Sequence, residues 1–464
     1  MNDSKKRSNH SLMTEGSILL AIKQIALPML LMMITAVTFS NIDARYISLL
    51  GKEALNGFNV LFPFLTLSSA MIYGGLGTGV SAMVARSFAK GDHDGRERTI
   101  RIGLYIVTFV CSLFAIIFCV AGPKIFAGLT ENPLAQKAAN QYSLIYFSTI
   151  FFMGWGAVFA SGLRGTGNAM RPAKYSIFVM LLNLITTPLF AFDHFSVFGL
   201  FKMSGLNWGV NGAAIASVLS SFILCLLLAR DLFSDNPSLW EKLFQWNFEK
   251  ILVKKILGIS LVAMLMPMMN SLLTAFVIRI LHFRGDAFVD SFSLSKRFEL
   301  ALIMLIVSLG NGVMVVVSAN HAIDNNQRVR ETINSGLKIL FAIFIPLLVF
   351  MAFASFVWFR IFTDVPETLR EGAVYFLWAS PGILFSSAII LLNFGFQGLT
   401  LPQKPLPYTI TSIVLFQGAG ALILKNQDIS TSSYYALTSV SSFICFLFVY
   451  RLFIKQLTPK EARE

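Results

Sequence analysis

Long apolar runs, separated by short charged segments, occupy most of the chain. Twelve runs of at least 18 residues contain no Lys, Arg, Asp or Glu: 24–42, 54–85, 102–123, 138–163, 175–192, 203–229, 256–278, 300–323, 339–359, 372–403, 405–424 and 429–450. About 20 apolar residues in a helix cross the hydrocarbon layer of a bilayer, and a helix pairs every backbone polar group within its own segment there. The pattern therefore predicts an all-α polytopic membrane protein with twelve transmembrane helices.

Two of these runs, 54–85 and 372–403, are longer than one level crossing of the bilayer requires. We expect each of them to include loop residues, a tilted helix or a break in the helix.

Composition excludes a soluble protein. Hydrophobic residues make up 55% of the 464 residues and charged residues only 13%, whereas soluble domains are about 25% charged. The four cysteines all lie inside predicted spans, so we expect no disulfides; they are Cys111, Cys119, Cys225 and Cys445.

The net charge of +13 reflects where the basic residues lie. When both termini are placed in the cytoplasm, most of the 37 lysines and arginines fall in cytoplasmic segments, which is the usual bias of membrane proteins. The basic balance then matches anionic lipid rather than nucleic acid. We expect a multi-pass protein of the cell membrane, typically the bacterial inner membrane, with cytoplasmic termini and no nucleic-acid partner.

A shift of about 233 residues brings the second half of the chain into register with the first. It aligns GLRG at 162–165 with GFQG at 395–398, GTG at 77–79 with GNG at 310–312, and Tyr142 with Tyr375. The repeat contains six spans, an even number, so both halves enter and leave the membrane on the same side. Two parallel six-helix bundles are therefore predicted.

The predicted boundaries are a first lobe over 1–230, a cytoplasmic amphipathic linker over 231–255 and a second lobe over 256–464. Transporters built from parallel repeats bind substrate between the halves and work by alternating access. Duplication within a channel or a scaffold is the alternative.

Enzyme motifs do not occur in the sequence. It contains no Walker loop, no HExxH and no Ser-His-Asp spacing, and its five histidines show no metal-ligand spacing. We expect neither an enzyme nor a metal or other cofactor. Because there is no nucleotide-binding segment, transport would draw its energy from an ion gradient.

Asp43 is the carboxylate that most clearly interrupts an apolar stretch. The apolar pattern resumes after it at 46–50, which places Asp43 in the outer half of the first helix rather than in a loop. An intramembrane carboxylate marks a functional site by default. The alternative is a residue at a helix end that pairs with Arg45 or faces water. With a shift of 234, Asp43 corresponds to Val277, so the repeat does not itself require the acid.

Two further positions within spans carry a helix-breaking or polar residue, and an oppositely charged pair precedes the eighth span. Pro28 removes one hydrogen bond from the first helix and permits bending, although proline is also tolerated in ordinary membrane helices. Asn183 can form a hydrogen bond to a carboxylate in either protonation state. Alternatively, its amide can hold neighbouring helices together by hydrogen bonds. Lys296 and Glu299, three residues apart, predict a local ion pair.

Several motifs, taken in order, make the chain resemble the MATE family of multidrug and toxic compound extrusion transporters. They are IALP at 25–28 with Asp43 fifteen residues later, LGKEAL at 50–55, GLGTGVSAMVARSFAKGD at 75–92, GLRGTGN at 162–168, Asn183 before PLF at 188–190, GVNGAAIAS at 209–217, ANHAIDNNQRV at 319–329 and FQG at 396–398. The resemblance covers nearly the whole chain.

The resemblance implies a secondary active exporter of organic cations and amphiphilic drugs, driven by inward flow of H⁺ or Na⁺. Asp43 stands where the family has its coupling carboxylate, Asn183 at the family's helix 5 asparagine, and Ser217 where a helix 6 Thr is often found. Thr187 departs from the pattern, because the H⁺-coupled branch commonly has a second Asp there. The carboxylates proposed for Na⁺ binding in another branch have no clear match either, which favours H⁺.

The same resemblance leaves two other functions open. The wider superfamily includes lipid-linked saccharide flippases, whose cavities can carry charge for anionic head groups. A channel would conduct current without countertransport. The expected partners are small-molecule drugs, the coupling ion H⁺ or Na⁺ and the lipid bilayer, and the expected oligomeric state is a monomer.

Overall fold

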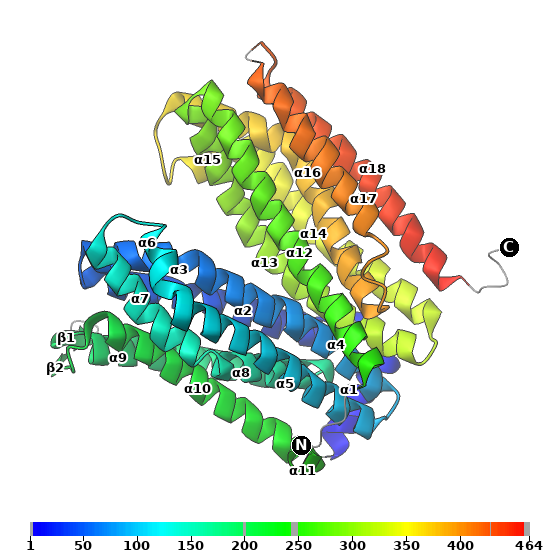
Figure 1. Ribbon diagram of the computed structural model, residues 1–464. Helices are drawn as coiled ribbons and strands as arrows, with labels where there is room; N and C mark the ends of the chain where they lie inside the picture. Colours follow the sequence, from blue (N-terminus) through cyan, green and yellow to red (C-terminus); the bar gives the residue numbers. More distant parts are fainter. Residues whose placement is uncertain (1–2, 198–200, 243–248, 427, 459–464) are drawn as a thin grey trace. The chain divides into compact units, whose positions relative to one another are not determined.

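The computed structural model describes residues 3–197, 201–242, 249–426 and 428–458, and nearly all of them are helical (Figure 1). The first half contains α1 (Asp3–Thr14), α2 (Ile18–Leu49), α3 (Lys52–Ser69), η1 (Ala70–Leu76), α4 (Gly77–Ala89), α5 (His93–Ile116), η2 (Ile117–Ala121), α6 (Gly122–Ala127), α7 (Pro133–Ser148), α8 (Phe151–Gly165), α9 (Met170–Ala191), β1 (His194–Val197), β2 (Phe201–Ser204) and α10 (Gly209–Asp235).

The second half follows the short helix α11 (Ser238–Lys242). It contains α12 (Lys250–Leu281), η3 (His282–Arg284), α13 (Asp286–Ala322), α14 (Asn326–Ala354), α15 (Phe356–Phe359), α16 (Pro366–Gly398), α17 (Leu406–Thr411), η4 (Ser412–Gly418), η5 (Ala419–Lys425) and α18 (Thr431–Leu457).

The prediction of a helical protein with many membrane spans is confirmed. Within the described ranges, 11 helices are long and apolar enough to cross a membrane, or up to 12 when α7 and α8 are taken as one span bent by 48°. The bend falls beside Thr149, whose hydroxyl donates to Ile145 O at 2.7 Å. A threonine that bonds backward in this way competes with the backbone and commonly bends a helix.

A short hairpin is the departure from an all-α fold among the described residues. β1 and β2 pair antiparallel, from His194 opposite Ser204 to Val197 opposite Phe201. The apolar run beginning at 203 predicts a single helix, but α10 begins only at Gly209, which is itself left-handed, as is Asn207 two residues earlier. Apolar composition alone does not separate a strand from a helix end.

The two longest apolar runs resolve differently. Run 54–85 lies in a helix that continues from α3 through the wider turns of η1 into α4, so the helix is long and locally unwound rather than broken. Run 372–403 combines most of α16 with a turn that begins at Leu399, in which Thr400 is left-handed. Run 372–403 includes loop residues, as expected, whereas run 54–85 contains neither a loop nor a break.

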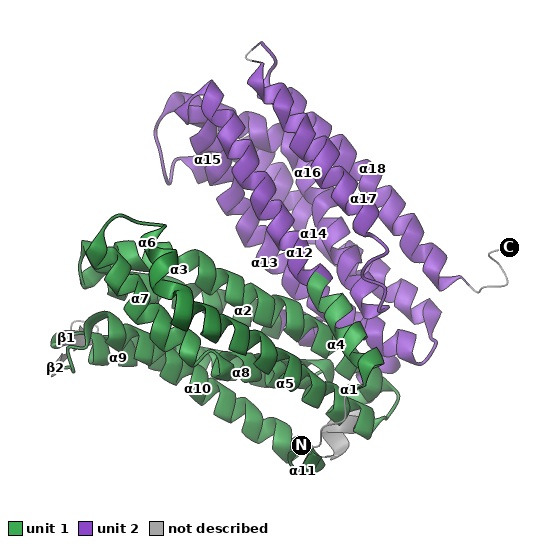
Figure 2. Ribbon diagram, viewed as in Figure 1, with its two compact units in different colours: residues 1–10, 28–261 green, residues 11–27, 262–464 purple. Residues whose placement is uncertain are grey.

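The chain forms two compact units, and two helices belong to both. Unit 1 comprises residues 1–10 and 28–261, and unit 2 comprises residues 11–27 and 262–464 (Figure 2). The boundary within α2 falls before Pro28, and the boundary within α12 falls before Val262. These positions correspond to each other under the 234-residue shift. The expected division into lobes at 230 and 256 remains a sequence prediction.

In each unit, a glycine packs closely against the helix segment that comes from the other half of the chain. In unit 1, a Cβ added at Gly79 on α4 would lie 2.7 Å from Ile256 O on α12. In unit 2, a Cβ added at Gly312 on α13 would lie 2.8 Å from Ile22 O on α2. Gly79 and Gly312 are repeat partners, and so are Ile22 and Ile256. The absence of a side chain lets the two backbones approach closely, as small residues do in membrane helix pairs.

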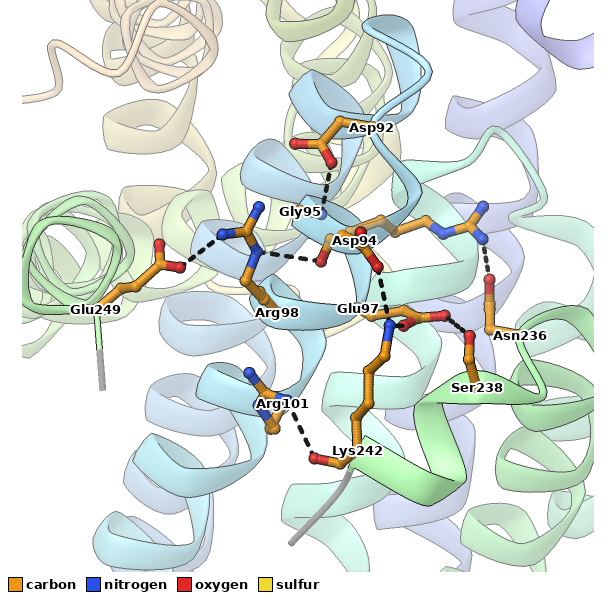
Figure 3. A network of polar contacts seen from close by, with 11 residues as sticks. Asp92, Asp94, Gly95, Glu97, Arg98, Arg101, Asn236, Ser238, Lys242 and Glu249 are labelled. Carbon is orange, nitrogen blue, oxygen red and sulfur yellow. Dashed lines mark hydrogen bonds and ion pairs between the residues drawn. The ribbon is translucent and has the colours of Figure 1, made fainter. Parts of the chain in front are cut away.

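The segment between the halves is fastened to α5 by a network of polar contacts (Figure 3). Lys242 Nζ lies 2.8 Å from Asp94 Oδ1 and 3.1 Å from Glu97 Oε2, and these hydrogen bonds raise the pKa of Lys242 above its ordinary value. Glu97 also accepts a hydrogen bond from Ser238. Arg98 forms an ion pair with Glu249 at 2.8 Å. The beginning and the end of the linker therefore contact the same helix.

The linker's expected amphipathic character remains a prediction, because residues 243–248 lie outside the described ranges. Of its apolar residues, Leu239 is fully buried, whereas Trp240 is exposed and packs edge-on against Phe233.

Candidate functional site: a buried carboxylate in unit 1

Asp43 lies inside α2, as the resumed apolar pattern predicts, and its side chain is only 4% exposed. Ser217 Oγ, on α10, donates to Asp43 Oδ2 at 2.9 Å. The other carboxylate oxygen, Oδ1, is buried and has no hydrogen-bond partner among the described residues. The alternative pairing with Arg45 does not occur within those residues, and Arg45 is exposed. Asp43 is therefore a buried acid with one oxygen held and one available.

Ser217 connects this acid to a third helix. Tyr142 OH, on α7, donates to Ser217 Oγ at 3.3 Å, and Ala213 O lies 3.2 Å from the same oxygen. A serine hydroxyl has one proton and two lone pairs. Ser217 therefore has a choice of two acceptors, Asp43 Oδ2 and Ala213 O, for its single proton.

The two polar residues predicted on α9 are both buried. Thr187 is fully buried and neighbours the Asp43 carboxylate, and its hydroxyl makes no hydrogen bond within the described ranges. Asn183 is 1% exposed, and neither its Nδ2 nor its Oδ1 has a partner there. The structure thus brings Thr187 to Asp43 but forms no hydrogen bond between Asn183 and Asp43. Buried amides normally find partners, so Asn183 is available to a ligand or to another arrangement of the helices.

The contact between α2 and α9 is fixed one turn from the acid. Tyr46 OH donates to Leu184 O at 3.0 Å, and Tyr46 follows Asp43 by three residues on the same helix. Pro28 lies within the first half of α2, at the boundary between the residues assigned to the two units, and the helix continues through it. Its expected role in bending remains a prediction.

Sequence reasoning missed Tyr142 as a residue of this site. Its only signal was the repeat, which aligns it with Tyr375. In unit 2, Tyr375 OH donates directly to a half-buried acid, Glu299, whereas Tyr142 OH reaches Asp43 only through Ser217. The expected ion pair between Lys296 and Glu299 is confirmed, with Nζ and Oε2 2.8 Å apart. Two tyrosines at equivalent positions thus face the acidic group of their own unit.

A cavity in unit 2 surrounds this second acid. It encloses about 790 Å³ of empty space, part of which is open to the surroundings, and is lined by α12, α13, α16, η4 and α18. Val277, the repeat partner of Asp43, lies in its wall with Tyr375. The cavity therefore occupies the position in unit 2 that the Asp43 site occupies in unit 1.

Buried polar side chains on many apolar spans, in a chain built from two repeats, are typical of membrane transporters. A sequence profile of the MatE family matches residues 28–189 and again residues 259–420, one stretch in each half. The chain belongs to the MatE family. It is a multi-pass membrane transporter and not an enzyme.

Two relatives extend over most of the chain. A protein of Shewanella oneidensis named FAD transporter is 24% identical over 373 residues, which cover 80% of each chain. A protein of Bacillus subtilis named probable multidrug resistance protein YpnP is 23% identical over 396 residues, which cover 83% of each chain.

Solved structures share the fold. One is described as an outward-facing conformation of a multidrug resistance MATE family transporter of the MOP superfamily; it has a TM-score of 0.82 at 21% identity and covers 97% of this chain and 99% of its own. Another, a MOP superfamily transporter from Pyrococcus furiosus described as having a binding pocket of reverse polarity, has a TM-score of 0.82 at 20% identity. At this identity the likeness establishes the fold alone.

Proposed function

We propose that this protein is a secondary active multidrug exporter that exchanges H⁺ for organic cations and amphiphilic drugs by alternating access. The observation that carries the proposal is the buried Asp43 carboxylate with one unpartnered oxygen. A buried acid without an opposite charge binds a cation or a proton in its place. Substrate and proton would compete for this group, and competition of that kind is sufficient for exchange.

The hydrogen bonds around Ser217 support a proton as the exchanged ion. When Asp43 is charged, Ser217 donates to Oδ2 and accepts from Tyr142. When Asp43 is protonated, its O–H can donate to Ser217, whose own proton then turns to Ala213 O. Because serine has one donor and two acceptor sites, both states satisfy the same three groups. Thr187, in place of a second acid, leaves Asp43 as the proton-carrying group of this site.

Loading and release of the proton would drive the transport cycle. Protonation removes the charge that holds a cationic substrate, and it rearranges the hydrogen bonds between α2 and α10. Bending of α2 at Pro28 would then reduce the space beside Asp43 and release the substrate outward. Loss of the proton to the cytoplasm would restore the charged site. Asn183, buried and without a partner in the described structure, would form contacts in one of these states.

A second candidate function is export of a flavin dinucleotide, because the relative from Shewanella oneidensis is named FAD transporter. The relative from Bacillus subtilis, whose name contains "multidrug resistance", favours drug export. The two functions differ in which substrate, FAD or a drug, the protein moves against its gradient.

Purified protein in proteoliposomes provides the test of the proposal. Efflux of an ethidium-type dye and of FAD would be measured under H⁺ and Na⁺ gradients imposed separately. We expect dye transport with the H⁺ gradient alone. Transport driven only by Na⁺ would refute the choice of ion, and transport of FAD without dye would support the second function. Movement of a lipid-linked saccharide without either would support a flippase.

The proposed cellular setting is the bacterial inner membrane, with both termini in the cytoplasm and the protein acting as a monomer. A tag attached after residue 464 should react with a membrane-impermeant reagent only when the cells are opened. Reaction in intact cells would contradict this orientation.

A further inference from the structure

The cavity of unit 2 differs in charge from the Asp43 site of unit 1. Its wall carries Val277 where the repeat places Asp43 in the other unit. Lys296 and Glu299, both on α13, are its charged lining residues among those described. Unit 1 thus offers an acid without a cationic partner, whereas unit 2 offers a lysine together with an acid.

Glu299 is occupied by contacts at both of its carboxylate oxygens. Tyr375 OH donates to Oε1, and Lys296 Nζ lies 2.8 Å from Oε2. The side chain of Glu299 is 16% exposed, whereas that of Lys296 is 31% exposed. The carboxylate is therefore held by the protein, and the ammonium is the more accessible member of the pair.

Lys296 retains hydrogen-bonding capacity. An ammonium group has three donors, and Glu299 is its one hydrogen-bond acceptor among the described residues. Its Nζ also lies 5.3 Å from the centre of the Phe292 ring, within the range of a cation–π contact. Two donors can thus bind an anionic oxygen without first breaking the pair with Glu299.

Aromatic rings form the wall beside this ammonium group. The ring of Tyr375 packs edge-to-face against the rings of Phe292 and Tyr435, with ring centres 5.8 Å and 4.8 Å apart, respectively. A flat ring system can pack against these aromatic rings in an offset-stacked or edge-to-face arrangement, and the cavity is partly open to the surroundings.

We infer that the cavity of unit 2 is a second ligand site, in which Lys296 binds the anionic group of an aromatic molecule. The ligand class is a flat ring system that carries one phosphate or carboxylate. The inference goes beyond the cation exchange proposed at Asp43 and does not rest on it, because binding here requires neither Asp43 nor an ion gradient.

Two flavins that differ only in one phosphate test this site. Full-length protein in detergent would be titrated at neutral pH with riboflavin 5′-phosphate and with riboflavin, and binding followed by quenching of flavin fluorescence. A hydrogen-bonded charge pair predicts that the phosphate form binds at least about tenfold more tightly. Equal affinity of the wild-type protein for the two flavins would overturn the inference.

Substitutions of the pair separate binding from structural damage. Lys296→Met with Glu299→Gln removes both charges together and should abolish the preference for the phosphate. Glu299→Gln alone leaves Lys296 free of its ion pair and should strengthen binding of the phosphate form several-fold. Weaker phosphate binding by Glu299→Gln, or a preserved preference in the double variant, would refute the assignment.

Two controls should leave the preference unchanged. Lys338→Met removes an exposed lysine of unit 2 that lies on α14, outside the cavity. Asp43→Asn removes the acid of unit 1. Loss of the preference in the Asp43→Asn protein would assign flavin binding to unit 1 and overturn the inference, whereas failure of dye efflux alone bears only on the proposed exchange.

Discussion

One carboxylate carries the exchange proposed for unit 1, and replacing it has a clear expected result. Asp43→Asn keeps the shape of the side chain and its bond to Ser217, so we expect a folded protein in the membrane. It cannot gain or lose the coupling proton, so dye efflux driven by a pH gradient should fall to background. Immunoblots of membranes and dye efflux in proteoliposomes measure the two outcomes, and wild-type efflux by a well-expressed variant would place coupling elsewhere.

Asn183 should matter less than Asp43. It is buried without partners in the described structure and makes no hydrogen bond to the acid. In the same assay we expect Asn183→Ala to retain part of the efflux.

Ser217 allows a second test at the scale of a single hydroxyl. Ser217→Ala removes the donor that holds the Asp43 carboxylate, and a hydrogen bond to a charged group contributes about 1.5–3 kcal/mol. We expect gradient-driven efflux to fall by about tenfold or more, and Ser217→Thr, which keeps the hydroxyl, to stay near wild type.

Ser221→Ala is the matched control for that comparison. Ser221 lies one turn further along α10 and donates only to Ser217 O among the described contacts. Equal efflux by Ser217→Ala and Ser221→Ala would show that the bond to Asp43 is unimportant.

The sequence predicted some residues of these sites for a physical reason. Asp43 interrupts an apolar stretch, and a charge in such a place is costly enough to be conspicuous. Tyr142 carries no such signal, because aromatic residues are common in membrane helices. Glu299 was interpreted as half of a local pair, which is correct, but only the packing of α13 against α16 reveals Tyr375 and the cavity beside it.

The close helix contacts give a prediction at the scale of elements. Gly79→Ala and Gly312→Ala place a methyl group less than 3 Å from the backbone of the crossing helix, and overpacking of this kind costs roughly 1–3 kcal/mol. Each variant should lower the melting temperature of the purified protein. Gly258→Ala is the control, since a Cβ there meets no atom within 4 Å. If all three variants melt alike, the close approach does not contribute to stability.

Element boundaries were predicted well where charge marks the membrane surface and poorly where it does not. Helix α13 begins at Asp286, well before the apolar run at 300, and this early part contains the Lys296–Glu299 ion pair. The bend between α7 and α8 lies beside a threonine hydroxyl that bonds backward along the helix, and the hairpin is formed by strand pairing. Neither changes the apolar pattern from which the spans were derived.

At the scale of the whole chain, the shared helices predict that neither half is stable alone. A chain cut within 243–248 would yield one piece that holds residues 11–27, which belong to unit 2, and another that holds residues 250–261, which belong to unit 1. We expect the pieces to accumulate and transport dye when produced together, and to be degraded when produced separately. Stable, folded accumulation of either piece alone would show that the crossing segments are dispensable.

The duplication could be predicted from the sequence, but the division of α2 and α12 between the two units could not. A constant shift along the chain identifies equivalent positions such as Gly79 and Gly312, and the MatE profile matches both halves separately. Which unit a helix end packs into depends on contacts between residues far apart in the chain. Nothing in the local sequence around Pro28 or Val262 records that choice.

The division of α2 between the units has a consequence for biosynthesis. Residues 18–27 leave the ribosome well before Gly312, against which Ile22 packs, because Gly312 lies almost 300 residues later in the chain. Domains otherwise tend to fold in order of synthesis. Here the first span must enter the bilayer and wait there, with its leading turns unpacked, until α13 has been inserted. Until then the nascent chain carries an open helix surface that a membrane chaperone or insertase can hold.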